Sequence, residues 1–274
     1  MLSRRLLILA VLVPSLSWFP ALSADEASST IQLFNGKDLT HFYTFLKGYG
    51  KNNDPKKVFT VVQEDGAPAI RVSGEVFGCF TTEKEFENYK LTVEYKWGNK
   101  TFPPREKATR DSGILLHCVG PDGAASGYWM ESIEYQLIEG GTGDFIVVGG
   151  NKTIGPQITV EVEDRPTGPK GAKQPYYKPG GEPRVFTSGR VNWYGRAANW
   201  TDTLGFRGPE DVEKPLGEWN TVEIICDGNT IISKLNGKIV NKATNVRPSK
   251  GKILFQSEGA EIFFRKIDLT PLKK

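Results

Sequence analysis

Acidic, amide and histidine side chains interrupt two segments that otherwise have the apolar alternation of buried β-strands. The first segment is Asp111-Ser-Gly-Ile-Leu-Leu-His117, in which Asp111, Gly113 and His117 share one face and the opposite face has the character of a core. We expect Asp111 and His117 to bracket the floor of a groove. Gly113 would keep that groove open, because glycine has no side chain.

The second segment, residues 132–144, places Glu134 and Gln136 on one face of a strand. Two polar groups on a central strand need either a solvated groove or dedicated partners. Glu139 has the other parity, but the two glycines that follow it could form a bulge that turns its side chain. Asp144 lies in the same turn. This segment therefore predicts a second group of polar side chains beside the first.

Together these residues form a predicted acid/base cluster. Carboxylates beside a histidine can supply a general base, a general acid or an oxygen-rich metal site. Each member also has an ordinary explanation, such as a strand histidine bonded to a carbonyl, a solvated carboxylate or the start of a turn. The conjunction is more informative than any member, and it consists of Asp111, His117, Glu134, Gln136, Glu139 and Asp144.

The elements that must position these groups are strands. Alternation is clearest in Tyr89-Lys-Leu-Thr-Val-Glu-Tyr-Lys-Trp97, where every second residue is large and apolar. No long segment after residue 24 has helical periodicity, so the many short strands predict an all-β sandwich or barrel. The other predicted strands are 58–63, 68–73, 76–82, 112–118, 131–138, 145–148, 157–163, 219–226, 229–235, 252–257 and 261–269.

Residues 164–217 break this pattern, because they are rich in proline, glycine and arginine and contain Trp193 and Trp200. A loop of this length in a compact domain is usually either functional or disordered. The aromatic side chains and arginines such as Arg190 favour an ordered insertion that faces a ligand, and a mobile surface loop is the alternative. Similar strands flank the loop, so we expect residues 25–274 to form a single domain.

Residues 1–24 have the three parts of a secretory signal peptide: a basic start, an apolar run over residues 6–13 and small residues near a cleavage point after Ser23 or Ala24. The run is shorter than the roughly 20 residues of a membrane span. No other stretch is apolar over that length. We therefore expect a secreted or periplasmic protein with no membrane span after cleavage.

Charge and cysteine content narrow the function classes. Lys plus Arg number 35 and Asp plus Glu 32, and the net charge of +3 gives no electrostatic reason to expect nucleic acid as a partner. Cys79, Cys118 and Cys226 are odd in number, so at most one internal disulfide can form. Each lies in a strand-like run, where a thiol usually behaves as a buried apolar group.

Several short motifs lie in a fixed order along the chain: Leu33-Phe-Asn-Gly-Lys-Asp-Leu39, the two polar strand segments above, Gly217-Glu-Trp-Asn220, Leu235-Asn-Gly237, Phe255-Gln-Ser-Glu-Gly259 and Phe264-Arg-Lys-Ile267. Each motif alone is unspecific. In this order they resemble the 3-keto-disaccharide hydrolase family over about residues 31–272. The resemblance implies a concanavalin A-like jelly roll, a sandwich of two antiparallel sheets with a sugar groove, here with the long inserted loop.

The resemblance also implies action on glycosides whose sugar carries a ketone at C3. The ketone makes the C2 proton acidic, because the resulting carbanion is stabilised as an enolate. A base removes that proton and the C1 substituent leaves, with or without later addition of water. The expected partners are therefore a carbohydrate substrate and, functionally, an oxidoreductase that acts at the sugar C3 and supplies the ketone.

Site residues follow from the same resemblance, position by position. Glu134 is expected to be the base or a metal ligand, and Gln136 to bond the sugar or the enolate. Asp111 and His117 fall where many relatives have Asn and Arg, and a protonated His117 could polarise the C3 oxygen. No cofactor is certain, but Asp111, His117 and Glu134 could hold a divalent cation that stabilises the enolate. The resemblance also implies that Glu139, Gln256 and Glu258 bind substrate. The residue pattern itself, apart from the resemblance, adds Asp144, Trp97, Trp193 and Trp200 to the expected substrate-binding residues.

Two other function classes compete with this enzyme. One is a non-catalytic carbohydrate-binding jelly-roll module, which would use Trp97, Trp129, Trp193 and Trp200 as stacking platforms. Such a module needs no buried acid/base cluster. The other is an ordinary glycosidase on unoxidised glucans, but the E-x-D-x-x-E strand expected of jelly-roll glucanases is not in the sequence.

Overall fold

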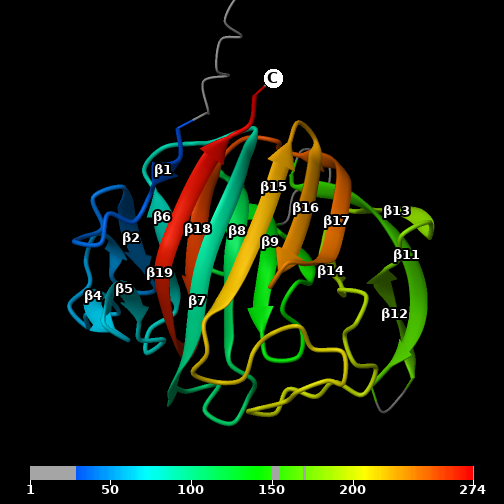
Figure 1. Cartoon of the computed structure of the whole chain (residues 1–274), viewed down its shortest axis with the longest axis horizontal. Coiled ribbons are helices and arrows are strands. Elements are labelled where there is room, and N and C mark those ends of the chain that lie inside the picture. The colour runs from blue at the N-terminus through cyan, green and yellow to red at the C-terminus, as the bar shows by residue number, and fades with distance from the viewer. Residues whose placement is uncertain (1–28, 150–154, 169–170, 274) are drawn as a thin grey trace, which may run out of the picture.

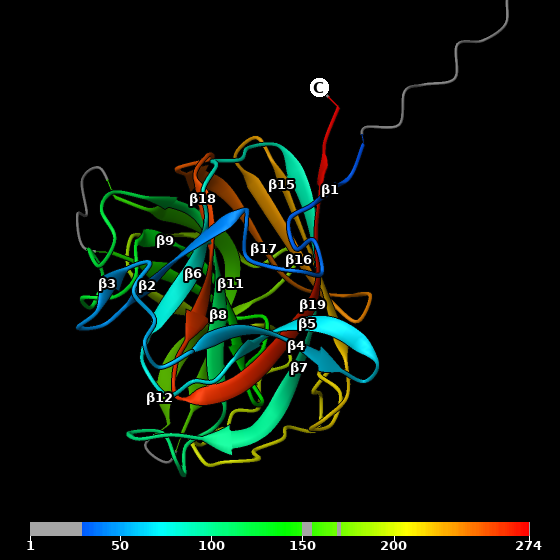
Figure 2. The ribbon, with the colours of Figure 1, turned by 90° about the vertical axis from the view of Figure 1, so that its left-hand side faces the viewer.

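A computed structural model of the chain describes residues 29–149, 155–168 and 171–273. Every regular element in these ranges is a β-strand, and the strands form two antiparallel sheets that face one another (Figures 1 and 2). The predicted all-β jelly-roll sandwich is therefore confirmed. The described ranges contain no apolar helix of the length that a membrane crossing needs. The predicted signal peptide, residues 1–24, lies outside the described residues.

The larger sheet has eleven strands, with the path β12-β11-β17-β16-β15-β7-β19-β5-β4, while β1 pairs with β19 and β13 with β11. Its strands are β1 (Ile31–Gln32), β4 (Phe59–Glu64), β5 (Ala67–Val72), β7 (Tyr89–Thr101), β11 (Gln157–Thr167), β12 (Ala172–Tyr177), β13 (Glu182–Phe186), β15 (Asn220–Asp227), β16 (Thr230–Leu235), β17 (Lys238–Arg247) and β19 (Ala260–Pro271).

The smaller sheet has eight strands in the order β14-β10-β9-β8-β18-β6-β2-β3. These strands are β2 (Phe42–Leu46), β3 (Gly50–Lys51), β6 (Gly78–Thr82), β8 (Asp111–Val119), β9 (Glu131–Ile138), β10 (Phe145–Val148), β14 (Gly189–Val191) and β18 (Lys252–Ser257). Strand β18, which is late in the sequence, lies at the centre of this sheet between β8 and β6.

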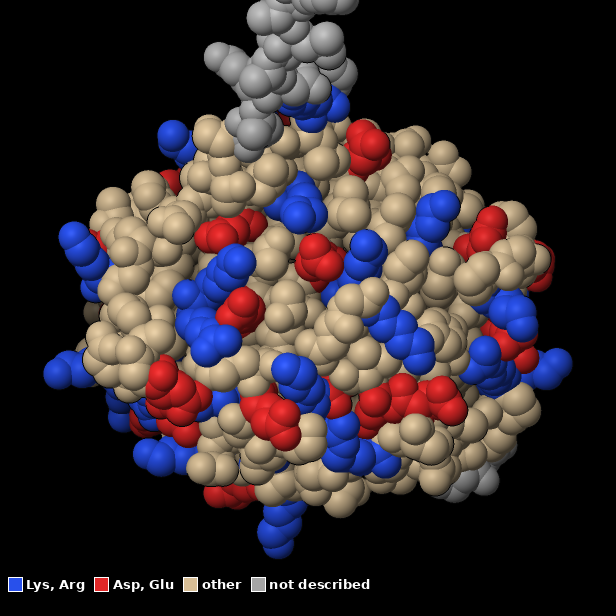
Figure 3. All heavy atoms as spheres, in the orientation of Figure 1, with Lys and Arg blue, Asp and Glu red and all other residues tan. Residues whose placement is uncertain are grey.

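The main core lies between the two sheets. Alternation along β7 buries Tyr89, Leu91, Val93 and Tyr95 against the smaller sheet, as the sequence pattern predicts. Burial of such large side chains supplies most of the stabilisation, at about 25 cal/mol per Å² of apolar surface removed from water. Figure 3 shows the outer face of the larger sheet, where acidic and basic side chains are interspersed.

A second apolar cluster lies on the outer face of the smaller sheet. It contains Leu115 of β8, Leu254 of β18, and Ala125 and Trp129 of the segment between β8 and β9. Part of the outer face of the smaller sheet is therefore covered as well, which contributes to the burial of β8. Cys79 and Cys118 belong to this cluster, Cys226 to the main core, and all three are buried free thiols.

The region predicted as one inserted loop is only partly a loop. Residues 164–217 contain the end of β11 and all of β12, β13 and β14. Their prolines and glycines do not prevent pairing, because β12 and β13 lie along one end of the larger sheet and tolerate interruptions that a central strand does not. Residues 192–219, between the end of β14 and the start of β15, form an irregular segment. The sequence pattern also missed β2 and β17.

Candidate active site

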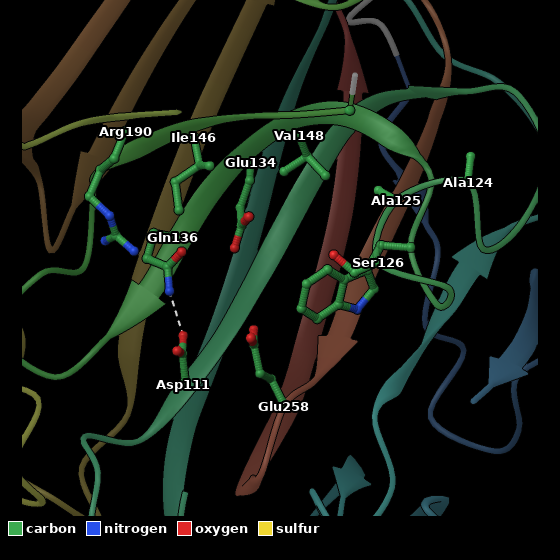
Figure 4. A pocket seen from close by; sticks show the side chains of 12 residues that line it. Asp111, Ala124, Ala125, Ser126, Glu134, Gln136, Ile146, Val148, Arg190 and Glu258 are labelled. Atoms are coloured by element: carbon green, nitrogen blue, oxygen red, sulfur yellow. Dashed lines mark hydrogen bonds between the residues drawn. The ribbon is translucent and has the colours of Figure 1, made fainter. Parts of the chain in front are cut away.

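A polar pocket of about 510 Å³ opens on the outer face of the smaller sheet (Figure 4). Its floor is built by the neighbouring strands β14, β10, β9, β8 and β18. The polar residues that line it are Asp111, Glu134, Gln136, Arg190 and Glu258, and the segment that carries Ser126 and Trp129 forms part of its wall.

Strand geometry brings Glu134 and Gln136 into this pocket, since residues two apart point to the same face. The alternate residues Ile133, Tyr135 and Leu137 point into the main core. Because β9 lies between β8 and β10, both side chains stand over the middle of the pocket floor. The two polar groups on this central strand thus face a cavity, as the sequence predicted.

Gly113 of β8 lies opposite Gln136 and makes room for the acids. A Cβ atom at this position would come within 2.5 Å of Glu134 Oε1 and 2.3 Å of Gln256 Oε1. Any side chain here would therefore displace both groups. Gln256 is fully buried, and neither polar atom of its carboxamide has a hydrogen-bond partner among the described residues. The expectation that Gly113 keeps the groove open agrees with this geometry.

Three carboxylates of the pocket have raised pKa values. Burial raises the pKa of Glu134 to about 8, and the charge of Asp111 adds to this effect. Burial raises the pKa of Asp111 to about 7, although the Arg105 guanidinium opposes the rise. The pKa of Glu258 lies well above its usual range, because of burial and then the charges of Asp111 and Glu134. The pocket can therefore hold and exchange protons near neutral pH.

Asp111 has two fixed partners. Arg105 Nη2 lies 3.1 Å from Asp111 Oδ2, and the Gln136 amide donates a hydrogen bond to Oδ1. Arg105 in turn lies 3.0 Å from Asp202, which belongs to the irregular segment 192–219. These contacts orient Asp111 and tie the long segment to the pocket.

Arg190 is held by a carboxylate that does not itself line the pocket. Asp144 is fully buried, and its Oδ2 accepts a hydrogen bond from Arg190 Nη1 at 2.6 Å and another from Arg196. Asp144 Oδ1 accepts the backbone N–H of Trp193 at 2.8 Å. Asp144 was predicted to bind substrate. Its position makes it instead the group that aims Arg190 into the pocket.

His117 does not lie in the pocket, and its expected place on the groove floor is corrected. The pairing of β8 with β9 shifts register between Leu116 and Val119, and His117 has a positive φ of 52°. This bulge turns the ring to the other side of the sheet, where it contacts Tyr89 at 5.9 Å between ring centroids. Its Nδ1 lies 2.9 Å from the Pro248 carbonyl oxygen, which can only accept, so Nδ1 carries the proton.

Burial also lowers the pKa of His117 to about 4. A neutral ring in the core cannot polarise a carbonyl in the pocket. The predicted cation-binding set of Asp111, His117 and Glu134 is not brought together either, because the bulge separates the histidine from the two acids. Among the described residues, no group of three or more His, Cys, Asp or Glu has the arrangement of a metal site.

Four other predicted substrate-binding residues lie away from the pocket. Glu139 pairs with Arg110, at 2.6 Å between Oε1 and Nη1, and the glycines after it do not turn it toward Glu134. Trp97 donates to buried Glu213 at 2.7 Å, and Trp193 is part of the main core. Trp200 packs on the Arg196 guanidinium, 4.1 Å from the ring centroid. Each therefore has a structural role here.

Sequence reasoning missed Arg105 and pointed to Arg190 and Trp129 only in general terms. Arg190 has a signal, because it lies in the arginine-rich segment expected to face a ligand. Trp129 was considered only as a platform of a binding module. Arg105 has no signal in the sequence, since its turn has neither strand alternation nor a motif.

The fold and the pocket define a class: an all-β sandwich that gathers carboxylates with raised pKa values and an arginine on one face of a sheet. The chain belongs to the 3-keto-α-glucoside-1,2-lyase-like domain family, whose model matches residues 29–270. The suspected family is thus confirmed, and the protein is a carbohydrate-active one. A comparison with curated protein sequences found no match.

Solved structures with a similar fold are distant in sequence. A "putative glycosyl hydrolase" from Parabacteroides distasonis is 18% identical, with a TM-score of 0.48 over 89% of this chain and 94% of that one. Alginate lyase AlyC3 is 11% identical, with a TM-score of 0.45 over 85% and 91%. The carbohydrate-binding module CBM66 from Bacillus subtilis is 9% identical, with a TM-score of 0.43 over 83% and 94%.

Proposed function

We propose that this protein is an enzyme that cleaves 3-keto-glycosides. The base takes the C2 proton, the C–H electron pair enters the enolate, and the C1–O bond then breaks. The leaving oxygen keeps the bonding pair and takes up a proton, so that a 1,2-unsaturated 3-keto sugar and a free alcohol are formed. Addition of water across the new double bond would give net hydrolysis.

One observation carries the proposal: a buried carboxylate with a raised pKa, Glu134, stands over an open pocket. A carboxylate with a pKa of about 8 is a stronger base than an ordinary one, as removal of a carbon-bound proton requires. Asp111, Glu258 and Arg190 also line the pocket around Glu134. The charges that develop later in the reaction, on the enolate and on the leaving oxygen, can therefore be stabilised in the same pocket.

The neighbours of Glu134 suggest the other roles. Arg190 is the cation of the pocket floor, held by Asp144, and is suited to stabilise the developing charge on the C3 oxygen. Burial raises the pKa of Glu258 well above its usual range, which favours the protonated form and suits this group to donate a proton to the leaving oxygen. Gln136 lines the pocket and supplies an amide for a sugar hydroxyl group, whereas Gln256 is fully buried and is not among the lining residues.

The export of this enzyme is part of the proposal. Residues 1–24 would direct it out of the cytoplasm, to the periplasm or the medium. A second enzyme, an oxidoreductase that acts at the sugar C3, would supply the ketone on which the proposed elimination depends.

The test is release of the alcohol from methyl 3-keto-glucosides of both anomers and from their unoxidised parents. We expect release from a keto form alone. Glu134→Gln is expected to lower kcat by about 10³-fold, because a positioned base contributes 10²–10⁴-fold. A parallel assay with chelator tests whether a cation takes part.

Glu139→Gln is the matched control, because Glu139 is also a buried carboxylate but lies outside the pocket. It should retain activity while folded. Sugar binding by the unchanged protein without turnover of either keto anomer would contradict the proposal and favour a carbohydrate-binding module.

A further inference from the structure

The pocket has a polar end and an apolar end (Figure 4). Arg190 and Gln136 lie at the polar end, and the carboxylates of Glu134 and Glu258 lie between the two ends. The apolar end is formed by side chains of β10 and of the segment between β8 and β9, namely Ala124, Ala125, Trp129 and Val148. A ligand that fills this pocket must therefore be polar at one end and apolar at the other.

The apolar end is a fixed surface. Trp129 is bonded to Ala125 through both backbone amides, at 2.9 and 3.0 Å, and its indole N–H donates to the Gly78 carbonyl at 3.3 Å. The ring also belongs to the apolar cluster with Leu115 and Leu254. A residue whose backbone is held by two hydrogen bonds, and whose ring is held by a third and by an apolar cluster, loses little freedom when a ligand packs on it.

The proposed reaction fixes the direction of the substrate along the pocket, and this step rests on that proposed function. In the sugar ring C2 lies between C3 and C1. If the C3 oxygen meets Arg190 and the C2 proton meets Glu134, the C1 substituent must point away from Arg190. In Figure 4 that direction leads toward Ala125 and Val148.

We propose that the apolar end is the subsite for the leaving group and that it selects a flat, apolar aglycone, such as an aryl group. A second sugar at this end would bring several hydroxyl groups, and each buried hydroxyl without a partner costs binding free energy. The described lining offers only the Ser126 hydroxyl and the backbone of Gly149 there. A flat ring needs no such partners and gains by packing on Trp129.

The test measures binding and turnover separately. Binding of phenyl glucoside, methyl glucoside and cellobiose to the wild-type protein is measured by calorimetry, with both anomers of the first two. We expect phenyl glucoside to bind about tenfold more tightly than methyl glucoside. Trp129→Ala should remove this preference, and it should lower kcat/KM for phenyl 3-keto-glucoside about tenfold more than for the methyl compound.

Phenol and methanol differ as leaving groups. This difference cancels, because for each substrate the kcat/KM of the variant is divided by the kcat/KM of the wild-type protein. Val148→Thr is a second variant that keeps the size of the side chain but adds a hydroxyl, and it should lower the phenyl preference about threefold. Trp219→Ala is the control, since Trp219 lies on the larger sheet side and bonds Asp65. It should leave the ratio unchanged.

The outcomes separate this inference from the proposed reaction. Equal losses for phenyl and methyl substrates in both pocket variants, or tighter binding of cellobiose than of phenyl glucoside, would overturn the aryl subsite while the reaction stands. A phenyl preference that depends on Trp129, without cleavage of any 3-keto compound, would support the subsite and overturn the reaction.

Discussion

Glu134 differs from the buried acids Asp144 and Glu139 in the charges around it. Asp144 and Glu139 each have an arginine at hydrogen-bond distance. The largest electrostatic influence of a neighbour on Glu134 is instead the repulsion from Asp111, and Arg190 only partly offsets it. A carboxylate in these surroundings binds a proton more readily, which makes it a better base once that proton is lost.

The pH dependence of the reaction is predicted from this pKa. Glu134 must be ionised to act as a base, and burial raises its pKa to about 8. We expect kcat/KM for a methyl 3-keto-glucoside to rise between pH 6 and pH 9 with the loss of one proton. Rates at each pH are corrected with an enzyme-free blank, because 3-keto-glycosides also decompose in base. A flat profile over this range would argue against Glu134 as the base.

Individual site residues could be predicted where the alternation of a strand or a family motif pointed to them. Asp111, Glu134, Gln136 and Glu258 all line the pocket. Arg105 could not be predicted, because its contact with Asp111 depends on how the turn after β7 folds back, and no short pattern encodes that path.

At the scale of elements, one bulge in β8 separates Asp111, which lines the pocket as expected, from His117, which does not. Alternation holds from Asp111 to Leu116, where β8 pairs regularly with β9. At His117 the extra residue reverses the parity, and the ring enters the core. A strand with apolar residues on both faces gives no sign of such a reversal, because either parity buries apolar side chains. Glu139 was misplaced for the related reason that a glycine pair does not reveal which way a chain turns.

Strand β14 carries Arg190, but the orientation of that side chain depends on the turn before β10. We predict that Asp144→Asn lowers kcat about tenfold or more with a smaller change in KM, because the neutral amide no longer fixes the Arg190 guanidinium. Steady-state kinetics below the melting temperature measure the effect. Glu139→Gln again serves as a control, since it also removes the carboxylate partner of a buried arginine. Equal loss of kcat in both variants would mean that Asp144 acts only on stability.

For the whole molecule, the sandwich follows from strand alternation, and most predicted strands agree with the observed ones to within one or two residues. Among the strands that were missed, β12 is exposed over its first half, so it has no alternation of apolar and polar residues to detect. Where a strand has no buried face, tertiary pairing decides its structure, and the local sequence does not.

The buried acids make the whole fold sensitive to pH. The folded pKa values of Glu134 and Asp111, about 8 and 7, exceed those of the unfolded chain. Between pH 5 and pH 9 the folded state therefore binds more protons, and stability falls as pH rises through these values. We predict that Glu134→Gln raises the unfolding temperature by about 5 °C at pH 9 and much less at pH 5. Thermal unfolding at both pH values tests this, and a shift of equal size at both would contradict it.

The central place of β18 in the smaller sheet has a consequence for the order of events during synthesis. Strands β8, β9 and β10 leave the ribosome early, and so do β2 and β6, but the two groups have no hydrogen-bonded neighbour in common until residues 252–257 have been made. Glu258 follows β18 directly. A nascent chain can pair β14, β10, β9 and β8 earlier, but it can add neither the fifth strand of the pocket floor nor the third acid before more than nine-tenths of the sequence has been translated. The complete set of acids becomes available only when the polypeptide is almost finished.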